Sequence, residues 1–131
     1  MGDISSLSTK KANDEGRPLV LVDPSTGDDL INDAGEPMVI LLVGSDSKEY
    51  RQYQSQIANK YRTRGKDPSL GQAQKMSIEL LAKSTRGFEN LQLNGEAIEF
   101  STDGAEKLYS NYAIIKDQVD EFVHERTNFL E

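Results

Sequence analysis

Cysteine is absent from this 131-residue chain, and histidine occurs once, as His124. Without cysteine the chain can form neither a disulfide framework nor a thiolate metal site. A glycine-rich phosphate-binding loop is also missing. These absences remove most of the residue patterns on which catalytic and cofactor sites are built, so we expect a non-enzymatic protein without a cofactor.

Long hydrophobic segments are missing as well. The longest uninterrupted apolar run, Met38 to Val43, is far shorter than the roughly 20 residues that a membrane-spanning helix needs. The polar N-terminus has no apolar core of the kind found in a signal peptide. We therefore expect a soluble cytoplasmic protein that does not contact a membrane.

The few possible metal ligands have simpler explanations. His124 has Asn128 four residues ahead of it, where a metal site would need a second strong ligand, and Asp120 four residues behind it suits a solvated His–Asp pair. Four aspartates share one loop but lack the ligand order of an EF-hand: Asp23, Asp28, Asp29 and Asp33. Turn formation and solubility explain these acids, so we predict no metal site.

Charge is distributed unevenly along the chain. The formal net charge is −7, yet residues 47–66 carry six basic residues against one acidic residue. Residues 88–131 carry ten acidic residues against three basic ones. A nucleic-acid-binding protein is usually basic overall, because its affinity comes from neutralising phosphates. The chain is instead an acidic body with one basic segment, which favours a protein partner.

The first half of the chain predicts a short arm followed by a β-hairpin and two helices. Residues 1–17 are polar and without periodicity, so we expect a flexible arm, followed by a single domain over residues 18–131. Apolar runs over 19–23 and 37–44 flank turn residues and predict two antiparallel strands, the second central and covered by helices on at least one side. A helix over 47–63 capped by Asp46, and a helix from Pro68 to Arg86 capped by Asp67 and Gly87, should follow. We expect the second helix to have a broad apolar surface that touches more than one element, made of two adjacent stripes: Leu70, Gln74, Ile78 and Leu81, and Ala73, Met76 and Leu80.

The second half predicts another hairpin and two further helices. Apolar residues alternate from Phe88 to Phe100 around Asn94-Gly95, the favoured pair for a two-residue hairpin turn. Ser101 or Thr102 then begins a short amphipathic helix, which breaks near Asn111 and is followed by a last helix that ends around Phe129. The predicted fold class is therefore α+β, with two β-hairpins, possibly forming one antiparallel sheet, and about four helices.

Residues 48–66 combine tyrosines with basic residues. Tyr50, Tyr53, Ile57 and Tyr61 form one helical stripe, which is typical of a helix that packs on a sheet, although aromatic and basic residues together can also bind single-stranded nucleic acid. The basic residues gather at the end of the helix and in the following loop. We predict that this cluster is the partner-binding surface, for an acidic protein segment or another copy of the chain: Lys60, Arg62, Arg64 and Lys66.

The order of several short motifs points to a known family. The motifs are D-P-S-T-G-D-D-L (23–30), G-E-P-M-V-I-L-L-V-G-S-D-S-K-E-Y-R (35–51), G-F-E-N-L-Q-L-N-G-E-A-I-E-F-S (87–101), A-E-K-L-Y (105–109) and T-N-F (127–129). Together they resemble the tail assembly chaperones of long-tailed bacteriophages, in which a P-x-T-G loop, a strand leading into a G-x-D-S helix start and an aromatic–G–x–I–x–F–S hairpin recur in this order. The resemblance covers residues 18–129. One departure is Phe88, where the family pattern has Trp, and either aromatic can anchor the hairpin.

The resemblance implies a function without catalysis. Such chaperones work in the cytoplasm of the infected host, coat the tape measure protein, help recruit tail tube subunits and are absent from the finished virion. Many are also made in a longer, frameshifted form. Two alternatives remain open from the sequence: a virion structural protein of the neck or tail-completion type, and a nucleic-acid-binding accessory protein that uses residues 48–66.

Overall fold

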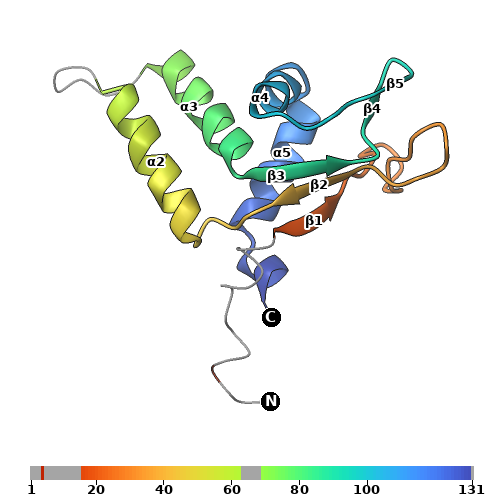
Figure 1. The fold of residues 1–131 in the computed structure, drawn as a ribbon, viewed down its shortest axis with the longest axis horizontal. Coiled ribbons are helices and arrows are strands. Elements are labelled where there is room, and N and C mark those ends of the chain that lie inside the picture. The colour runs from red at the N-terminus through yellow and green to blue at the C-terminus, as the bar shows by residue number, and fades with distance from the viewer. Residues whose placement is uncertain (1–3, 5–15, 63–68, 131) are drawn as a thin grey trace.

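The computed structural model describes residues 4, 16–62 and 69–130. In chain order its elements are β1 (Arg17–Val20), β2 (Val39–Leu42), α2 (Lys48–Lys60), α3 (Leu70–Lys83), β3 (Thr85–Glu89), β4 (Gln92–Leu93), β5 (Glu96–Ala97), α4 (Thr102–Asn111), α5 (Ala113–His124) and the short 3-10 helix η2 (Arg126–Phe129) (Figure 1). The fold class is α+β, as predicted, with four α-helices and two small antiparallel sheets in the described part of the chain. No helix in these residues is both long and apolar enough to cross a membrane.

The larger sheet has the strand order β1-β2-β3, and both pairs are antiparallel. The predicted pairing of the first two strands is confirmed, and β2, which is apolar throughout, is the central strand. Strand β1 already includes Arg17, so the predicted arm of residues 1–17 is one residue too long. The rest of that arm, apart from Gly16 and Ile4, lies outside the described residues.

The third strand, β3, was not predicted as a separate strand: its last two residues, Phe88 and Glu89, were expected to begin the second hairpin, and the residues before them to end the helix. The helix expected to reach Arg86 ends at Lys83, and Gly87, expected to cap it, lies inside β3 instead. Two hydroxyl groups bond back to the last turn of α3: Ser84 Oγ donates to Leu80 O at 2.8 Å and Thr85 Oγ1 donates to Leu81 O at 2.9 Å. Such side-chain bonds to the backbone compete with continuation of the helix. The chain therefore leaves α3 directly into a strand that pairs with β2.

The second predicted hairpin is confirmed as β4 and β5. Asn94 and Gly95 have φ angles of 53° and 81°, as a two-residue turn with left-handed central residues requires. The hairpin forms its own two-stranded sheet, so the two predicted hairpins do not combine into one sheet.

Serine begins three of the helices. The Oγ of Ser47 accepts a hydrogen bond from the N–H of Tyr50 at 3.0 Å, so Ser47, not Asp46, caps α2. Ser69 caps α3 in a reciprocal capping box with Gln72, so the predicted cap at Asp67 is wrong. Ser101 caps α4, as one of the two predicted alternatives.

The C-terminal part ends differently from the prediction. Helix α5 ends at His124, five residues before the expected end near Phe129, and Arg126–Phe129 form the 3-10 helix η2. The turn is fastened by Asn128 Nδ2, which donates to Phe122 O at 3.1 Å. The ring of the buried Phe129 packs edge-on against Phe122 at 5.5 Å.

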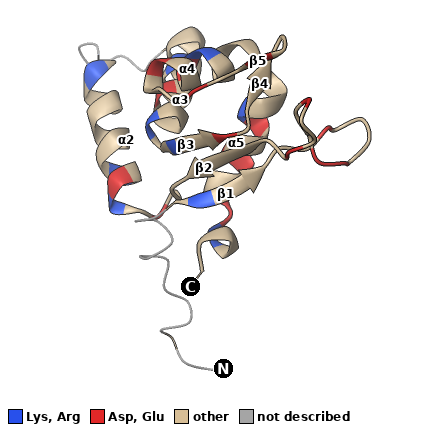
Figure 2. Cartoon of the chain, turned by 45° about the vertical axis from the view of Figure 1, so that its right-hand side comes forward, with Lys and Arg blue, Asp and Glu red and all other residues tan. Residues whose placement is uncertain are grey.

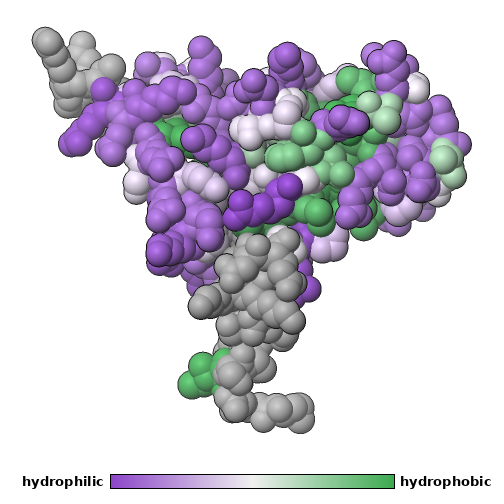
Figure 3. Space-filling view, in the orientation of Figure 1, coloured by the Kyte–Doolittle hydropathy of each residue, from purple (hydrophilic) through white to green (hydrophobic). Residues whose placement is uncertain are grey.

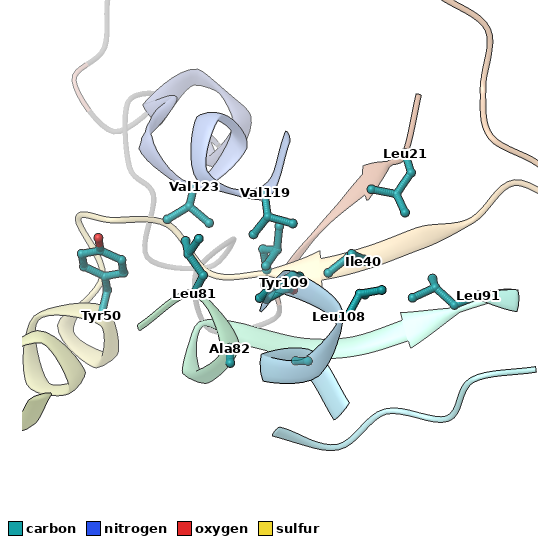
Figure 4. Packing of buried hydrophobic residues seen from close by; sticks show 12 residues of the cluster. Leu21, Ile40, Tyr50, Leu81, Ala82, Leu91, Leu108, Tyr109, Val119 and Val123 are labelled. Carbon is teal, nitrogen blue, oxygen red and sulfur yellow. The ribbon is translucent and has the colours of Figure 1, made fainter. Parts of the chain in front are cut away.

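The core lies between one face of the three-stranded sheet and the helices. Figure 4 shows Ile40 and Leu21 of the sheet side pointing toward residues of α4 and α5, among them Tyr109 and Val119. Helix α3 contributes Leu81 and Ala82 to the same cluster, whereas Leu70, predicted to belong to the apolar surface of this helix, is 79% exposed. Helix α2 packs on α3 rather than on the sheet, and places Tyr50 and Ile57 of the tyrosine stripe in buried positions.

Candidate partner-binding site

The predicted basic cluster lies at the C-terminal end of α2, where Figure 2 shows a blue helix end. Lys60 and Arg62 are exposed, while Arg64 and Lys66 lie outside the described residues. The Nζ of Lys60 lies 3.2 Å from both carboxylate oxygens of Glu79 on α3, and the hydroxyl of Tyr61 donates to the same carboxylate. Lys60 therefore fastens α2 to α3, and Arg62 is the described member of the cluster that extends into solvent.

The carboxyl group of Glu79 is ionised more readily than usual. Desolvation disfavours its charged form, but the hydrogen bonds from Tyr61 and Lys60 and the positive charges of Lys60 and Lys83 outweigh this effect. The pKa of Glu79 consequently lies below its ordinary value. The hydrogen bond to Glu79 in turn raises the pKa of Tyr61, because it stabilises the neutral phenol beside a negative charge. The contacts of Lys60 and Tyr61 with Glu79 therefore hold α2 against α3, in addition to forming part of a charged surface.

A second set of side-chain contacts links α2 to α5. The predicted His–Asp pair is present, with His124 Nδ1 3.3 Å from Asp120 Oδ1 and both side chains about half exposed. His124 Nε2 also lies 3.2 Å from the hydroxyl of Tyr50, whose pKa is raised by burial and, to a smaller extent, by the charge of Asp120. These residues border an open hollow of about 400 Å³ between α2, α3 and α5. In the described residues no group of three or more His, Asp or Glu side chains is arranged to hold a metal ion.

The acidic loop between β1 and β2 forms turns, as predicted. The carboxylate of Asp23 accepts hydrogen bonds from Ser25 Oγ at 2.7 Å and Ser25 N at 2.9 Å, and these bonds lower its pKa. The backbone C=O of Asp23 accepts from Gly27 N at 2.7 Å, where a φ of +78° favours glycine. The carboxylate of Asp33 accepts from Gln92 Nε2 at 2.7 Å, which ties this loop to β4.

In the described part of the chain, one face of the three-stranded sheet is not covered by a helix. Neighbouring residues of a strand point to opposite faces, and the row Leu19, Ile40 and Phe88 belongs to the helix-covered core. The opposite face carries two rows in register, Pro18, Leu41 and Gly87, and Val20, Val39 and Glu89. We call this second set the uncovered sheet face.

The uncovered sheet face is mostly apolar, and in it Pro18 is exposed, Val20 and Leu41 are half-buried and Val39 is buried. In the orientation of Figures 1 and 3, α5 lies behind the sheet, and hydrophobic residues gather over β2 and β3 on the side turned to the viewer. Leu41 lies over Gly87, where an added Cβ would be 3.5 Å from Leu41 Cδ1. Antiparallel sheets with one solvated face usually carry polar residues there. A grouped apolar surface of this kind is typical of a contact with another protein.

The sequence analysis did not identify this face, although a signal was present. Residues 38–43 are apolar at both odd and even positions, so both faces of β2 carry apolar side chains. The sequence does not show whether the helices will cover the odd-numbered or the even-numbered residues of β2.

Comparisons of the chain with protein families, with curated protein sequences and with solved structures find no match.

Proposed function

We propose that this chain is a non-enzymatic phage tail assembly chaperone that binds the tape measure protein in the host cytoplasm and helps recruit tail tube subunits. The order of short motifs across residues 18–129 supports the proposal. The structural observation that carries it is the uncovered sheet face, an apolar surface on a chain with a net charge of −7. Such a surface can contact apolar side chains, while the acidic remainder keeps the complex in solution.

The physical task of such a chaperone fits a small contact surface. A long, partly helical tape measure chain exposes apolar residues that must stay covered until tube subunits polymerise around it. A contact made by Pro18, Val20 and Leu41 is weak on its own, because association costs at least about 4 kcal/mol in lost freedom. Many copies along one partner chain would supply avidity and still allow release. The exposed Arg62, together with Lys60, Arg64 and Lys66, would add a charged contact beside α2.

Co-expression with the tape measure protein encoded by the same genome tests the proposal. We expect the two proteins to co-purify, and we expect Val20→Lys and Leu41→Lys to reduce the recovered tape measure protein more than about tenfold, because each places a charge in an apolar contact. Ile114→Lys is the matched control, since Ile114 is an exposed apolar residue of α5 outside the uncovered sheet face. Circular dichroism should show that all three variants remain folded.

Other outcomes of the same programme would overturn the proposal. Mass spectrometry that finds the chain in stoichiometric amounts in purified particles would support a structural protein of the neck or tail-completion type. Salt-sensitive binding to DNA or RNA at moderate ionic strength would support a nucleic-acid-binding accessory protein. Equal tape measure binding by the Val20, Leu41 and Ile114 variants would show that the uncovered sheet face is not the contact.

A further inference from the structure

The two edges of the three-stranded sheet carry hollows of opposite charge. At the β1 edge, an open hollow of about 470 Å³ lies between the strand and α5. Its apolar lining includes Val22 and Phe122, and its charged lining residues are Glu121 and Glu125, both exposed. We call the two glutamates and this hollow the acidic edge.

Backbone pairing at the acidic edge is restricted at two positions. Pro18 has no N–H to offer a neighbouring strand. Beyond the strand, the side-chain amide of Gln118 on α5 occupies the backbone groups of Val22: its Oε1 accepts from Val22 N at 2.9 Å and its Nε2 donates to Val22 O at 2.8 Å. Little of this edge is left for backbone pairing, so side-chain contacts with the apolar hollow and the two carboxylates would supply most of the contact with a partner.

The β3 edge carries the opposite charge. A hollow of about 410 Å³ lies where β3 meets the end of α3 and the start of α4, and its charged lining residues are Lys83 and Arg86. The same hollow is lined by Phe100, whose side chain remains 38% exposed after packing edge-on against Phe88. We call Lys83, Arg86 and this hollow the basic edge.

The charges of both edges lack ion-pair partners within the described part of the chain. The ion pairs found there within 4.0 Å are Lys60–Glu79 and His124–Asp120, and neither involves an edge residue. Lys83 lies over the ring of Tyr53 at 5.8 Å, and Glu125 accepts hydrogen bonds from the neutral Thr127. These contacts orient the two side chains, and the charge of Lys83 is offset only in part, by Glu79, whose pKa it helps to lower.

We infer that copies of this chain associate head to tail, with the acidic edge of one copy against the basic edge of the next. The inference rests on the two hollows and their charges, and does not require the proposed function. Because β1 and β3 are opposite edges of one sheet, each bound copy still presents one edge of each sign (Figure 1). A contact between two different surfaces closes into a ring or continues as an open row, depending on the rotation between copies. The apolar hollow and Phe100 add contact area to the charge attraction.

Sedimentation velocity on the full chain over a range of concentrations tests the inference. We expect association at an ionic strength of about 0.01 M and much less at about 1 M, where the Debye length falls from about 30 Å to about 3 Å. Reversal of the acidic edge (Glu121→Lys with Glu125→Lys) and reversal of the basic edge (Lys83→Glu with Arg86→Glu) should each lower the association constant more than about tenfold, because like charges then face each other. Glu36→Lys with Glu96→Lys is the control, since it changes the net charge as the acidic-edge reversal does but lies outside both edges.

Mixing the two reversed variants gives the decisive measurement. In an equimolar mixture, every contact between a β1 edge of one variant and a β3 edge of the other again joins opposite charges, so association should return. Recovery would also show that both variants are folded. A wild-type chain that stays monomeric at low ionic strength refutes the inference, and so does a mixture of folded variants, checked by circular dichroism, that does not associate. Tape measure binding by a strictly monomeric chain would refute head-to-tail association and leave the proposed function standing.

Discussion

Thr85 and Tyr109 share a buried hydrogen bond whose direction follows from the structure. Their oxygens lie 2.7 Å apart, and the two residues are 4% and 1% exposed. Thr85 Oγ1 uses its single hydrogen to donate to Leu81 O at 2.9 Å. The hydroxyl of Tyr109 must therefore be the donor to Thr85, and the two bonds form a relay from α4 through the start of β3 to the last turn of α3.

This direction predicts unequal costs for two conservative substitutions. Tyr109→Phe removes the donor but leaves Thr85 bonded to Leu81, so we expect a loss of about 0.5–1.5 kcal/mol in the free energy of unfolding. Thr85→Val keeps the shape of the side chain but leaves the buried Tyr109 hydroxyl without an acceptor, and the carbonyl of Leu81 loses a donor. We expect that change to cost about 1–3 kcal/mol.

Urea denaturation followed by far-ultraviolet circular dichroism would measure both costs. The double variant should lose less than the sum of the single losses, because an unsatisfied hydroxyl no longer remains in the core, and we expect a coupling of about 1 kcal/mol. The reasoning is refuted if Thr85→Val is no more destabilising than Tyr109→Phe, or if the two losses simply add.

Two further predictions concern alkaline pH and the basic cluster. Burial raises the pKa of Tyr109 to about 12, so the stability that its neutral hydroxyl contributes is fully present below pH 10 and is lost as the pH rises from about 10 to about 12. At about 1.4 kcal/mol per pKa unit this loss approaches about 3 kcal/mol, and a matched pH series of urea denaturation should show a smaller alkaline loss in Tyr109→Phe. Charge reversal of Arg62 and Arg64 to Glu should weaken partner binding or self-association, while unfolding changes by under about 0.5 kcal/mol. If both kinds of association are unchanged in pull-down and sedimentation measurements, the predicted partner-binding role of the cluster is wrong.

The two predicted hairpins show which parts of this fold are determined by local sequence signals. Asn94-Gly95 and the apolar run before Gly44 are local signals, and the structure confirms both. Strand β3 has no comparable signal, because Phe88 is its one large apolar residue and the helical pattern of α3 continues up to it. Its strand conformation comes from pairing with β2, and such tertiary context outweighs local preference.

Helix starts were predicted to within one or two residues, for a different reason. Asp46 and Ser47 are adjacent and both can accept the required hydrogen bond, so the geometry of the incoming chain decides between them. At α3 the sequence did carry a distinguishing feature, since Ser69 and Gln72 have the spacing of a capping box.

The candidate surfaces also differ in whether they are local in the sequence or form only when the chain folds. The basic cluster at residues 60–66 is contiguous in the sequence and was recognised there. The acidic and basic edges could not be recognised, because Lys83 and Arg86 acquire their relation to Glu121 and Glu125 only when β1, β2 and β3 align. Uncovered and covered faces of β2 differ by one residue of register, and the docking of α4 and α5 on one side decides between them.

The hydrogen bonds between the Gln118 amide and Val22 can form only late in synthesis of the chain. Gln118 is separated from Val22 by 96 residues of chain, so the residue it binds is synthesised well before it. At roughly 5–20 residues per second, the N-terminal strands wait on the order of 5–20 s for α5 to be made. During that interval Val22 has neither its acceptor nor its donor from Gln118, and β2 has neither face covered by α4 or α5. The nascent chain is then more prone to aggregate than the finished protein, and the last helix to be translated ends that period.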